Sequence, residues 1–324
     1  MRRGGIGRFG FSIAAAAVVA AGAGGGPASA AGSGPAKLCG APTGSAPATY
    51  RHVVVIMDEN KSYGDIIGRS AAPYLNHLAA ACGLATNYRG VTHPSHPNYM
   101  AATGGIRTPL GYVAAPNIFR QVHRAGGSWR VYEEAMPHNC DRRSAAPYKA
   151  GHNPGISYAS IRTGCRSWDV GWSRFKRDMA AHHLPTYAFI TPDQCHNMHA
   201  SCTRGMNAVR AGDRWLARVI PQIVATPGYR RGRTVIFVTW DEGSHGQRAE
   251  QRGENCLALV HLEDASCHVP TFILSEYIAA GARSGRLFSH YSLLQTTERL
   301  LGLNSFLGHA ADPATTGMRA AFRF

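Results

Sequence analysis

The chain has 324 residues, 44% of them hydrophobic, and a formal net charge of +15 at pH 7. This length suits one α/β domain with a large core. The basic residues are almost all arginine, which is typical either of GC-rich codon usage or of a surface that attracts anionic phosphoesters or lipid headgroups. The sequence lacks the interleaved basic and aromatic stretches of single-strand nucleic-acid binders, so we expect no specific nucleic-acid partner.

Residues 1–30 have the composition of a signal peptide. Arg2, Arg3 and Arg8 precede an apolar, alanine-rich run, and Ala28-Ser29-Ala30 supplies small residues for cleavage. The run is too short and too rich in Gly and Ala for a convincing spanning helix, although a retained N-terminal anchor is the alternative. We therefore expect a secreted protein with a flexible lead-in over residues 31–50 and a single folded domain over residues 51–324.

Cysteine usage agrees with export. An even number of cysteines outside the cytosol favours disulfides. The sequence has no Cys-x-x-Cys pair, which argues against a zinc site. Pairing of neighbours along the chain is the simplest arrangement. It gives the bridges 39–82, 140–165, 195–202 and 256–267.

The predicted elements alternate between strands and helices. We expect strands at residues 53–57, 129–132, 186–191, 234–240 and 271–274, and helices at residues 73–81, 117–125, 174–182, 206–225 and 289–301. Continuous apolar runs such as residues 53–57 are typical of buried parallel strands. The pattern predicts an α/β fold with a mostly parallel central sheet covered by helices on both faces. In such folds ligands bind at the carboxyl ends of strands.

Acidic residues lie at those carboxyl ends. Asp58, Glu59 and Asn60 follow the first strand, and Asp241 and Glu242 follow the strand at residues 234–240. Oxygen ligands of this kind suit a hard divalent cation. A solvated turn with a helix cap is the alternative for residues 58–60.

A candidate nucleophile lies between these segments. Pro97 fits the first turn of a helix, so Ser95 or His96 is expected to cap it. A hydroxyl at a helix N-terminus meets free N–H groups that stabilise an alkoxide or a phosphoryl group. Simple helix capping by Ser95 is the alternative.

A second candidate cluster follows the strand at residues 186–191. Asp193 and His199 lie on a short loop and could bind one metal ion, with His196 as an alternative ligand. His268, directly before the strand at residues 271–274, is the candidate third ligand. A polar surface loop is the alternative.

Four segments together resemble the bacterial phosphoesterase family, which contains secreted acid phosphatases and phospholipases C. They are Glu59-Asn60-Lys61-Ser62-Tyr63 with Gly68, the run Thr92-His93-Pro94-Ser95-His96-Pro97-Asn98-Tyr99, Trp240-Asp241-Glu242, and His268-Val269-Pro270. The resemblance covers nearly the whole chain after residue 51. It implies an alkaline-phosphatase-like three-layer sandwich, with the sheet between helical layers.

The resemblance also implies roles for individual residues. In the related nucleotide pyrophosphatases a nucleophilic Thr precedes Phe-Pro-Asn, and Ser95 holds that place here, with Thr92 as the other candidate. The comparison places a divalent metal ion among Glu59, Asn60, Ser95, Asp241 and Glu242, with Asp58 as an alternative ligand, and a second ion among Asp193, His199 and His268. Either one or two ions of unknown identity are expected. Asn60 and Asn98 are expected to hold phosphoryl oxygens, and His96 or His93 to protonate the leaving group.

The expected function is hydrolysis of phosphomonoesters through a phosphoserine intermediate, as in an acid phosphatase. The alternative is a phospholipase C that cleaves phospholipid phosphodiesters. The substrate is expected to be a phosphorylated small molecule or lipid, and the positive charge is compatible with peripheral association with anionic membrane surfaces. A metal-independent serine hydrolase fits less well because no Gly-x-Ser-x-Gly sequence surrounds Ser95.

Overall fold

The computed structural model describes residues 1, 10, 38–40, 44–109, 111–244 and 254–324. Residues Ala36–Phe324 form one compact unit. Apart from Met1 and Gly10, the expected signal peptide lies outside the described residues. No described helix is both long enough and apolar enough to cross a bilayer.

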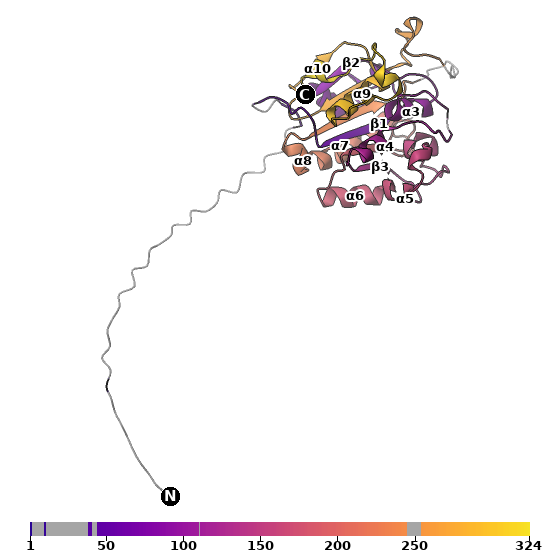
Figure 1. The fold of residues 1–324 in the computed structure, drawn as a ribbon. Coiled ribbons are helices and arrows are strands. Elements are labelled where there is room, and N and C mark those ends of the chain that lie inside the picture. Colours follow the sequence, from indigo (N-terminus) through magenta and orange to yellow (C-terminus); the bar gives the residue numbers. More distant parts are fainter. Residues whose placement is uncertain (2–9, 11–37, 41–43, 110, 245–253) are drawn as a thin grey trace. The chain divides into compact units, whose positions relative to one another are not determined.

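One sheet of nine strands forms the centre of the described domain (Figure 1). Its order is β4-β3-β5-β1-β6-β7-β2-β8, and β9 also pairs with β2. The strands are β1 His52–Asp58, β2 Gly83–Arg89, β3 Trp129–Glu133, β4 Asp169–Gly171, β5 Tyr187–Thr191, β6 Thr234–Trp240, β7 His268–Leu274, β8 Arg283–Ser284 and β9 Phe288–Ser289. All pairings are parallel except those of β7, which runs antiparallel to both β6 and β2. The mostly parallel sheet confirms the predicted α/β class.

The apolar composition of β1 and β6 explains why they lie at the centre. Residues 53–57 and the whole of β6 are buried. A parallel strand covered on both faces needs a continuous apolar run, and both strands supply one. Their register pairs Asp58 with Trp240, which brings the acidic residues that follow each strand to one edge.

Helices cover both faces of the sheet (Figure 1). They are α1 Tyr63–Ile66, α2 Pro73–Ala81, α3 His96–Gly104, α4 Ile118–Arg124, α5 Cys165–Trp168, α6 Trp172–Ala180, α7 Ala208–Val224, α8 Pro227–Arg230, α9 His290–Leu300 and α10 Arg319–Phe322. Helix α3 packs against α4 and α9, while α2 packs against α7. Trp172 of α6 also packs against Trp215 of α7, with ring centroids 5.3 Å apart.

Every strand and helix expected from the sequence is present, with its ends shifted by at most a few residues. Strand β2 was not expected, because its sequence GLATNYR lacks both a clear alternation and a continuous apolar run. The reversal of β7 was not expected either. Strand direction depends on the path of the connecting segment, which residue patterns do not reveal.

All four expected disulfides are present, joining Cys39 to Cys82, Cys140 to Cys165, Cys195 to Cys202 and Cys256 to Cys267. The bridge from Cys39 to Cys82 ties the lead-in, which was expected to be flexible, to the domain. The described part of this segment is held to the domain, because Tyr50 is buried and the Tyr229 hydroxyl donates to the Leu38 carbonyl.

Candidate active site

The site lies at the sheet edge where β1 and β6 end and α3 begins. The amide of Asp241 donates to the Asp58 carbonyl at 3.0 Å, which continues the pairing of the two strands beyond their last residues. Glu59 and Asp241 are fully buried. The structure therefore gathers the acidic residues of two separate strand ends beside Ser95, as the sequence pattern predicted for such edges.

Ser95 is the N-cap residue of α3 and is partly exposed. Its hydroxyl donates to Glu59 Oε2 at 3.1 Å and also stabilises the ionised Asp241 carboxyl. Pro97 lies in the first turn of the helix, where its missing N–H costs nothing. The Ser95 oxygen thus lies between buried carboxylates and the positive end of a helix.

Asn60 holds two of the acidic side chains. Its backbone N–H donates to Asp241 Oδ1 at 3.0 Å, and its side-chain Nδ2 donates to Glu242 Oε1 at 2.9 Å. These bonds need a left-handed backbone at Asn60, with φ of 45°, which asparagine tolerates better than most residues. Asn60 therefore positions the carboxylates in addition to any contact with a substrate.

Burial gives the site its electrostatic character. Burial first, and then repulsion from Asp241, raises the pKa of both Asp58 and Glu59 well above the ordinary values. The pKa of Asp241 is raised as well, first by burial and then by Glu242. Within the described chain, both Asp58 oxygens and Asp241 Oδ2 are buried without a hydrogen-bond partner. A cation would offset the cost of ionising these buried acids together, and an all-oxygen donor set fits a hard divalent ion.

Glu59 has two partners that the sequence did not reveal. The Tyr99 hydroxyl donates to Glu59 Oε1 at 2.6 Å, and His152 Nδ1 lies 3.3 Å from the same oxygen. Burial lowers the pKa of His152 to about 3. Tyr99 follows Ser95 by one helical turn, and that spacing could have indicated it. No local pattern marks His152.

The remaining residues of the Ser95 segment mainly brace the loop. Asn98 Oδ1 accepts from the amides of Val91 and Thr92 at 2.8 and 3.3 Å, and its Nδ2 donates to the Thr92 carbonyl. The buried Thr92 hydroxyl donates to the His93 carbonyl. His96 Nδ1 bonds to the Gly151 carbonyl at 2.8 Å, and burial lowers the pKa of His96. Asn98 and His96, expected to touch substrate, thus have internal partners in this structure.

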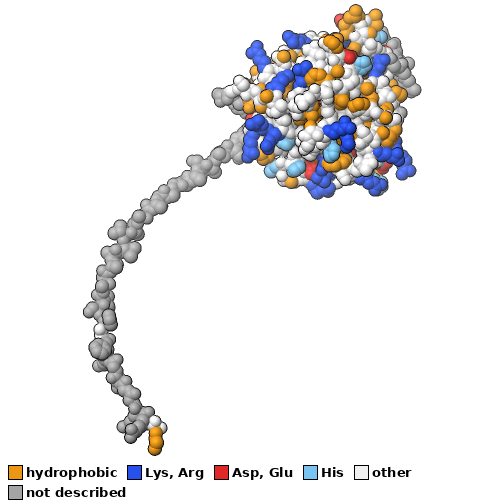
Figure 2. All heavy atoms as spheres, in the orientation of Figure 1, with side chains coloured by type: hydrophobic (Ala, Val, Ile, Leu, Met, Phe, Trp, Pro, Cys, Tyr) orange, Lys and Arg blue, Asp and Glu red, His pale blue; other side chains and the backbone are white. Residues whose placement is uncertain are grey.

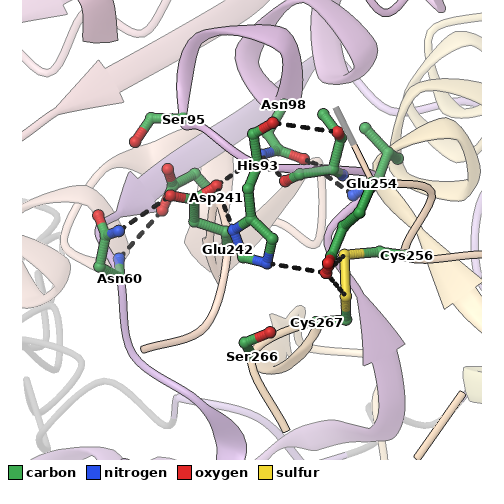
Figure 3. Close-up of polar contacts among 12 residues, drawn as sticks. Asn60, His93, Ser95, Asn98, Asp241, Glu242, Glu254, Cys256, Ser266 and Cys267 are labelled. Atoms are coloured by element: carbon green, nitrogen blue, oxygen red, sulfur yellow. Dashed lines mark hydrogen bonds and ion pairs between the residues drawn. A yellow bond between two sulfur atoms is a disulfide. The ribbon is translucent and has the colours of Figure 1, made fainter. Parts of the chain in front are cut away.

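A chain of polar contacts extends from the site toward a disulfide (Figure 3). Glu242 Oε2 lies 2.9 Å from His93 Nδ1, and His93 Nε2 lies 3.4 Å from Glu254 Oε1. Glu254 Oε1 also lies 3.2 Å from Cys267 Sγ, in the bridge to Cys256. The Glu242 carboxylate contacts the side chains of Asn60, His93 and Asn98. No local pattern singled out Glu254, and its place here depends on the long connection between β6 and β7.

The expected second ligand set is not gathered in one place. Asp193 Oδ1 lies 3.2 Å from His196 Nδ1, which in turn lies 3.0 Å from Glu134 Oε2. The side chain of His199 is exposed. His268 stacks on Tyr63 with centroids 4.7 Å apart.

The sheet order explains the separation of His268 from Asp193. Asp193 follows β5 and His268 begins β7, three strands away. Three strand spacings amount to about 14 Å. The residues that do surround Asp193 are Glu134 and the alternative ligand His196, and these three could hold an ion.

The fold and this site define a class of protein, an α/β phosphoesterase with alkaline-phosphatase-like architecture. The chain belongs to the phosphoesterase family, which matches residues 68–304, and it is a hydrolase of phosphoric ester bonds. Glu59 and Asn60 lie just outside the matched range.

Two individual proteins are similar in sequence to this chain. The chain is 28% identical to a phosphatidylinositol-3-phosphatase of Mycobacterium tuberculosis, over 80% of this chain and 79% of that protein. It is 26% identical to a probable acid phosphatase of Kluyveromyces lactis, over 60% of this chain and 48% of that protein. The chain thus spans about half the length of that yeast relative.

A solved structure supports the fold. A protein of the alkaline phosphatase superfamily from Vibrio parahaemolyticus superposes with a TM-score of 0.55 at 14% identity, covering 86% of this chain and 76% of that one.

Proposed function

We propose that this protein is an exported, metal-dependent phosphomonoesterase that uses Ser95 as its nucleophile. The observation that carries the proposal is the position of the Ser95 hydroxyl, which lies at the start of α3 and donates to the buried Glu59 carboxylate. The names of the relatives support a monoester substrate, either a small molecule or the phosphorylated headgroup of a lipid.

Glu59, Asp241 and Asn60, with Ser95 and either Glu242 or Asp58, would hold the divalent ion. When bound, such an ion supplies a Lewis acid that lowers the pKa of the attacking hydroxyl and offsets the charge of the phosphoryl group. The chain's own contribution is to hold the carboxylates buried and fixed. Asn60 anchors Asp241 and Glu242, and Tyr99 anchors Glu59.

In the proposed reaction, Ser95 Oγ gives its proton to the Glu59 carboxylate that it contacts and attacks phosphorus in line with the leaving oxygen. The bond from phosphorus to that oxygen breaks as the Ser95 bond forms, which leaves phosphoserine and an alcohol. His93 would supply the proton for the leaving oxygen, and its contacts with Glu242 and Glu254 would favour a protonated imidazole. Water then attacks phosphoserine, which regenerates Ser95 and releases inorganic phosphate.

One assay tests the class of reaction. Purified protein is incubated with a water-soluble phosphomonoester and with a phosphocholine diester, each with and without a chelator. We expect hydrolysis of the monoester, loss of that activity in the chelator, and recovery when a divalent cation is added back. Preference for the diester would instead indicate a phospholipase C, and full activity in the chelator would remove the metal from the proposal.

The role of the buried acids is tested by Asp241→Asn. The variant should lose activity and retain less metal by elemental analysis, because the Asp241 carboxylate would be a ligand. Asp312→Asn, at an exposed position where the carboxylate contacts His309, is the matched control and should keep both. An active Asp241→Asn variant with unchanged metal content would contradict the assignment.

A further inference from the structure

An exposed apolar tip lies on the loop between Cys256 and Cys267. Leu259 and Val260 each expose 85% of their surface, far more than Leu287, the next large hydrophobic residue in the described chain, at 41%. Both belong to one 3₁₀ turn, Leu259–His261. Exposing two adjacent large aliphatic side chains is unfavourable in water unless something covers them.

The loop that carries this tip is held firmly at its base. The Cys256–Cys267 bridge closes it, the Cys256 amide donates to the Val91 carbonyl at 3.2 Å, and the Gly90 amide donates to the Cys267 carbonyl at 2.9 Å. The guanidinium of Arg89 donates to the carbonyls of His261 and Asp264. In Figure 1 the loop projects from the domain in light orange. The apolar tip is thus displayed on a fixed stem.

The stem rises from the edge of the sheet that carries the active site. It leads into β7 at His268, and antiparallel β7 starts at the edge where β1 and β6 end. Glu254, at the base of the loop, reaches His93, which contacts Glu242 (Figure 3). A surface that covers the tip would therefore face the same edge as Ser95.

Basic side chains lie near the same region. A hollow beside the loop is lined by Leu257 and Leu287 together with Arg107 and Arg286, and both arginines are exposed. Figure 2 shows Lys and Arg side chains distributed over the visible face, in keeping with the formal charge of +15. The acidic Glu263 and Asp264 of the loop face Arg89, which offsets part of their charge. Apolar side chains beside exposed cations match the chemistry of an anionic lipid surface.

We propose that Leu259 and Val260 insert into an anionic lipid bilayer and that the loop thereby presents the Ser95 edge to phosphorylated lipid headgroups. This inference rests on the proposed function for its substrate class. The chemistry of the tip favours a bilayer over free lipid, because two side chains on a fixed stem are too few to enclose an acyl chain.

The test compares the full chain with Leu259→Ser/Val260→Ser. Binding is measured by cosedimentation with phosphatidylcholine vesicles, with and without phosphatidylserine, and turnover is measured on a water-soluble monoester and on a phosphoinositide in those vesicles. We expect the double variant to keep its activity on the soluble ester and to lose about tenfold in vesicle binding and in vesicle turnover. Ala265→Ser, on the stem of the same loop, should change neither.

Two further variants test the orientation and the charge. Val260→Trp should show a blue-shifted emission when vesicles are added, because the indole enters the bilayer. Arg286→Gln should weaken the dependence on phosphatidylserine.

The two proposals fail in different assays. If the proposed function is wrong, the protein will not hydrolyse the soluble ester. If the membrane proposal is wrong, the failure appears in the cosedimentation measurement, which does not depend on turnover. Wild-type protein that does not bind anionic vesicles would overturn the proposal. Equal vesicle binding by the double variant would do the same. A change from dimer to monomer in the double variant with unchanged vesicle binding would assign the tip to contact between two copies of the chain.

Discussion

At the scale of single residues, two hydroxyls of one short segment have different surroundings. Ser95 is partly exposed and donates to the Glu59 carboxylate, whereas Thr92 is buried and donates to the His93 carbonyl. Only Ser95 combines access to a substrate with a carboxylate partner and a helix N-terminus. The structure therefore favours Ser95 over Thr92 as the candidate nucleophile.

Replacing the two hydroxyls separately tests this difference. We expect Ser95→Ala to lower kcat by about three orders of magnitude or more, because the attacking oxygen is gone. Thr92→Val should lower it far less, since only a hydrogen bond to a backbone carbonyl is lost. Steady-state kinetics on a soluble monoester would decide, and the reverse ranking would transfer the role to Thr92.

Glu254 acts through another residue. It holds His93 from the side opposite Glu242, so its removal should let His93 and then Glu242 move. We expect Glu254→Gln to lower kcat by about fivefold to fiftyfold with little change in KM, and Glu254→Asp to recover part of the loss. Glu263→Gln, on the same loop but exposed, is the control. A change in KM alone would mean that Glu254 affects substrate binding instead.

At the scale of elements, two disulfides of similar kind lie at opposite edges of the sheet. The Cys256–Cys267 bridge lies directly before β7 and beside Glu254, whereas Cys82 precedes β2 at the edge where β7 ends. Their loss should cost comparable stability, about 2–4 kcal/mol each. Their effects on the active site should differ.

We expect Cys256→Ala/Cys267→Ala to lower kcat at temperatures where the protein is still folded, because the base of the loop holds Glu254. Cys39→Ala/Cys82→Ala should lower the Tm while leaving kcat nearly unchanged. Thermal unfolding and kinetics on both double variants would separate the effects. Equal kcat in both would show that the bridge near the site acts on stability alone.

The loop at residues 193–199 is anchored by an ion pair. His196 lies between Asp193 and Glu134, and the Trp215 indole donates to Glu134 at 3.0 Å. We expect His196→Ala to lower the free energy of unfolding by about 1 kcal/mol, a modest value because the imidazole is partly exposed. His268→Ala should have no effect on this loop.

Metal content of the same two variants tests the second ligand set. If Glu134, Asp193 and His196 hold an ion, His196→Ala should contain less metal per chain than wild type and His268→Ala should not. A loss of metal in His268→Ala would restore the ligand set expected from the sequence.

At the scale of the whole molecule, several groups bind protons more tightly in the folded state. Burial raises the pKa of Asp169 to about 7 and that of Glu298 to about 8. Hydrogen bonds that His196 donates to the carboxylates of Asp193 and Glu134 raise the pKa of His196 to about 9. Each pKa lies above its value in an unfolded chain, so each contribution to stability is full at low pH and is lost as the pH rises through the folded value.

The Tm should therefore fall between pH 7 and pH 9, above the range in which buried histidines with lowered pKa, such as His152, oppose the trend. Glu298→Gln should flatten the decline, gaining about 1–3 kcal/mol relative to wild type at pH 8 and little at pH 5, because the buried charge is removed. The Gln oxygen can still accept from the Leu307 amide, as Glu298 does at 3.0 Å. Thermal scans across this pH range would test the sign, and a Tm that rises with pH would contradict it.

Local patterns in the sequence predicted the class of fold, offered the four disulfides as the simplest pairing, and indicated acidic residues at one edge of the sheet. Continuous apolar strands are buried centrally, and acids directly after parallel strands meet at one edge, so Glu59 and Asp241 could be predicted to lie together. The place of Ser95 beside them was implied by the resemblance to the phosphoesterase family. Only the bridges 195–202 and 256–267 close short loops, with separations of 7 and 11 residues, so the other two rested on the simplicity of neighbour pairing. These inferences depend on local patterns and on rules for parallel sheets.

Contacts between distant segments could not be predicted in this way. The partners of Glu59, which are Tyr99 and His152, and the link from Glu242 through His93 to Glu254 join segments far apart in the chain. The separation of His268 from Asp193 follows from the sheet order, and the exposure of Leu259 and Val260 follows from how their loop rises from the domain. Side-chain contacts between distant segments depend on the packing of the whole chain, which no local pattern contains.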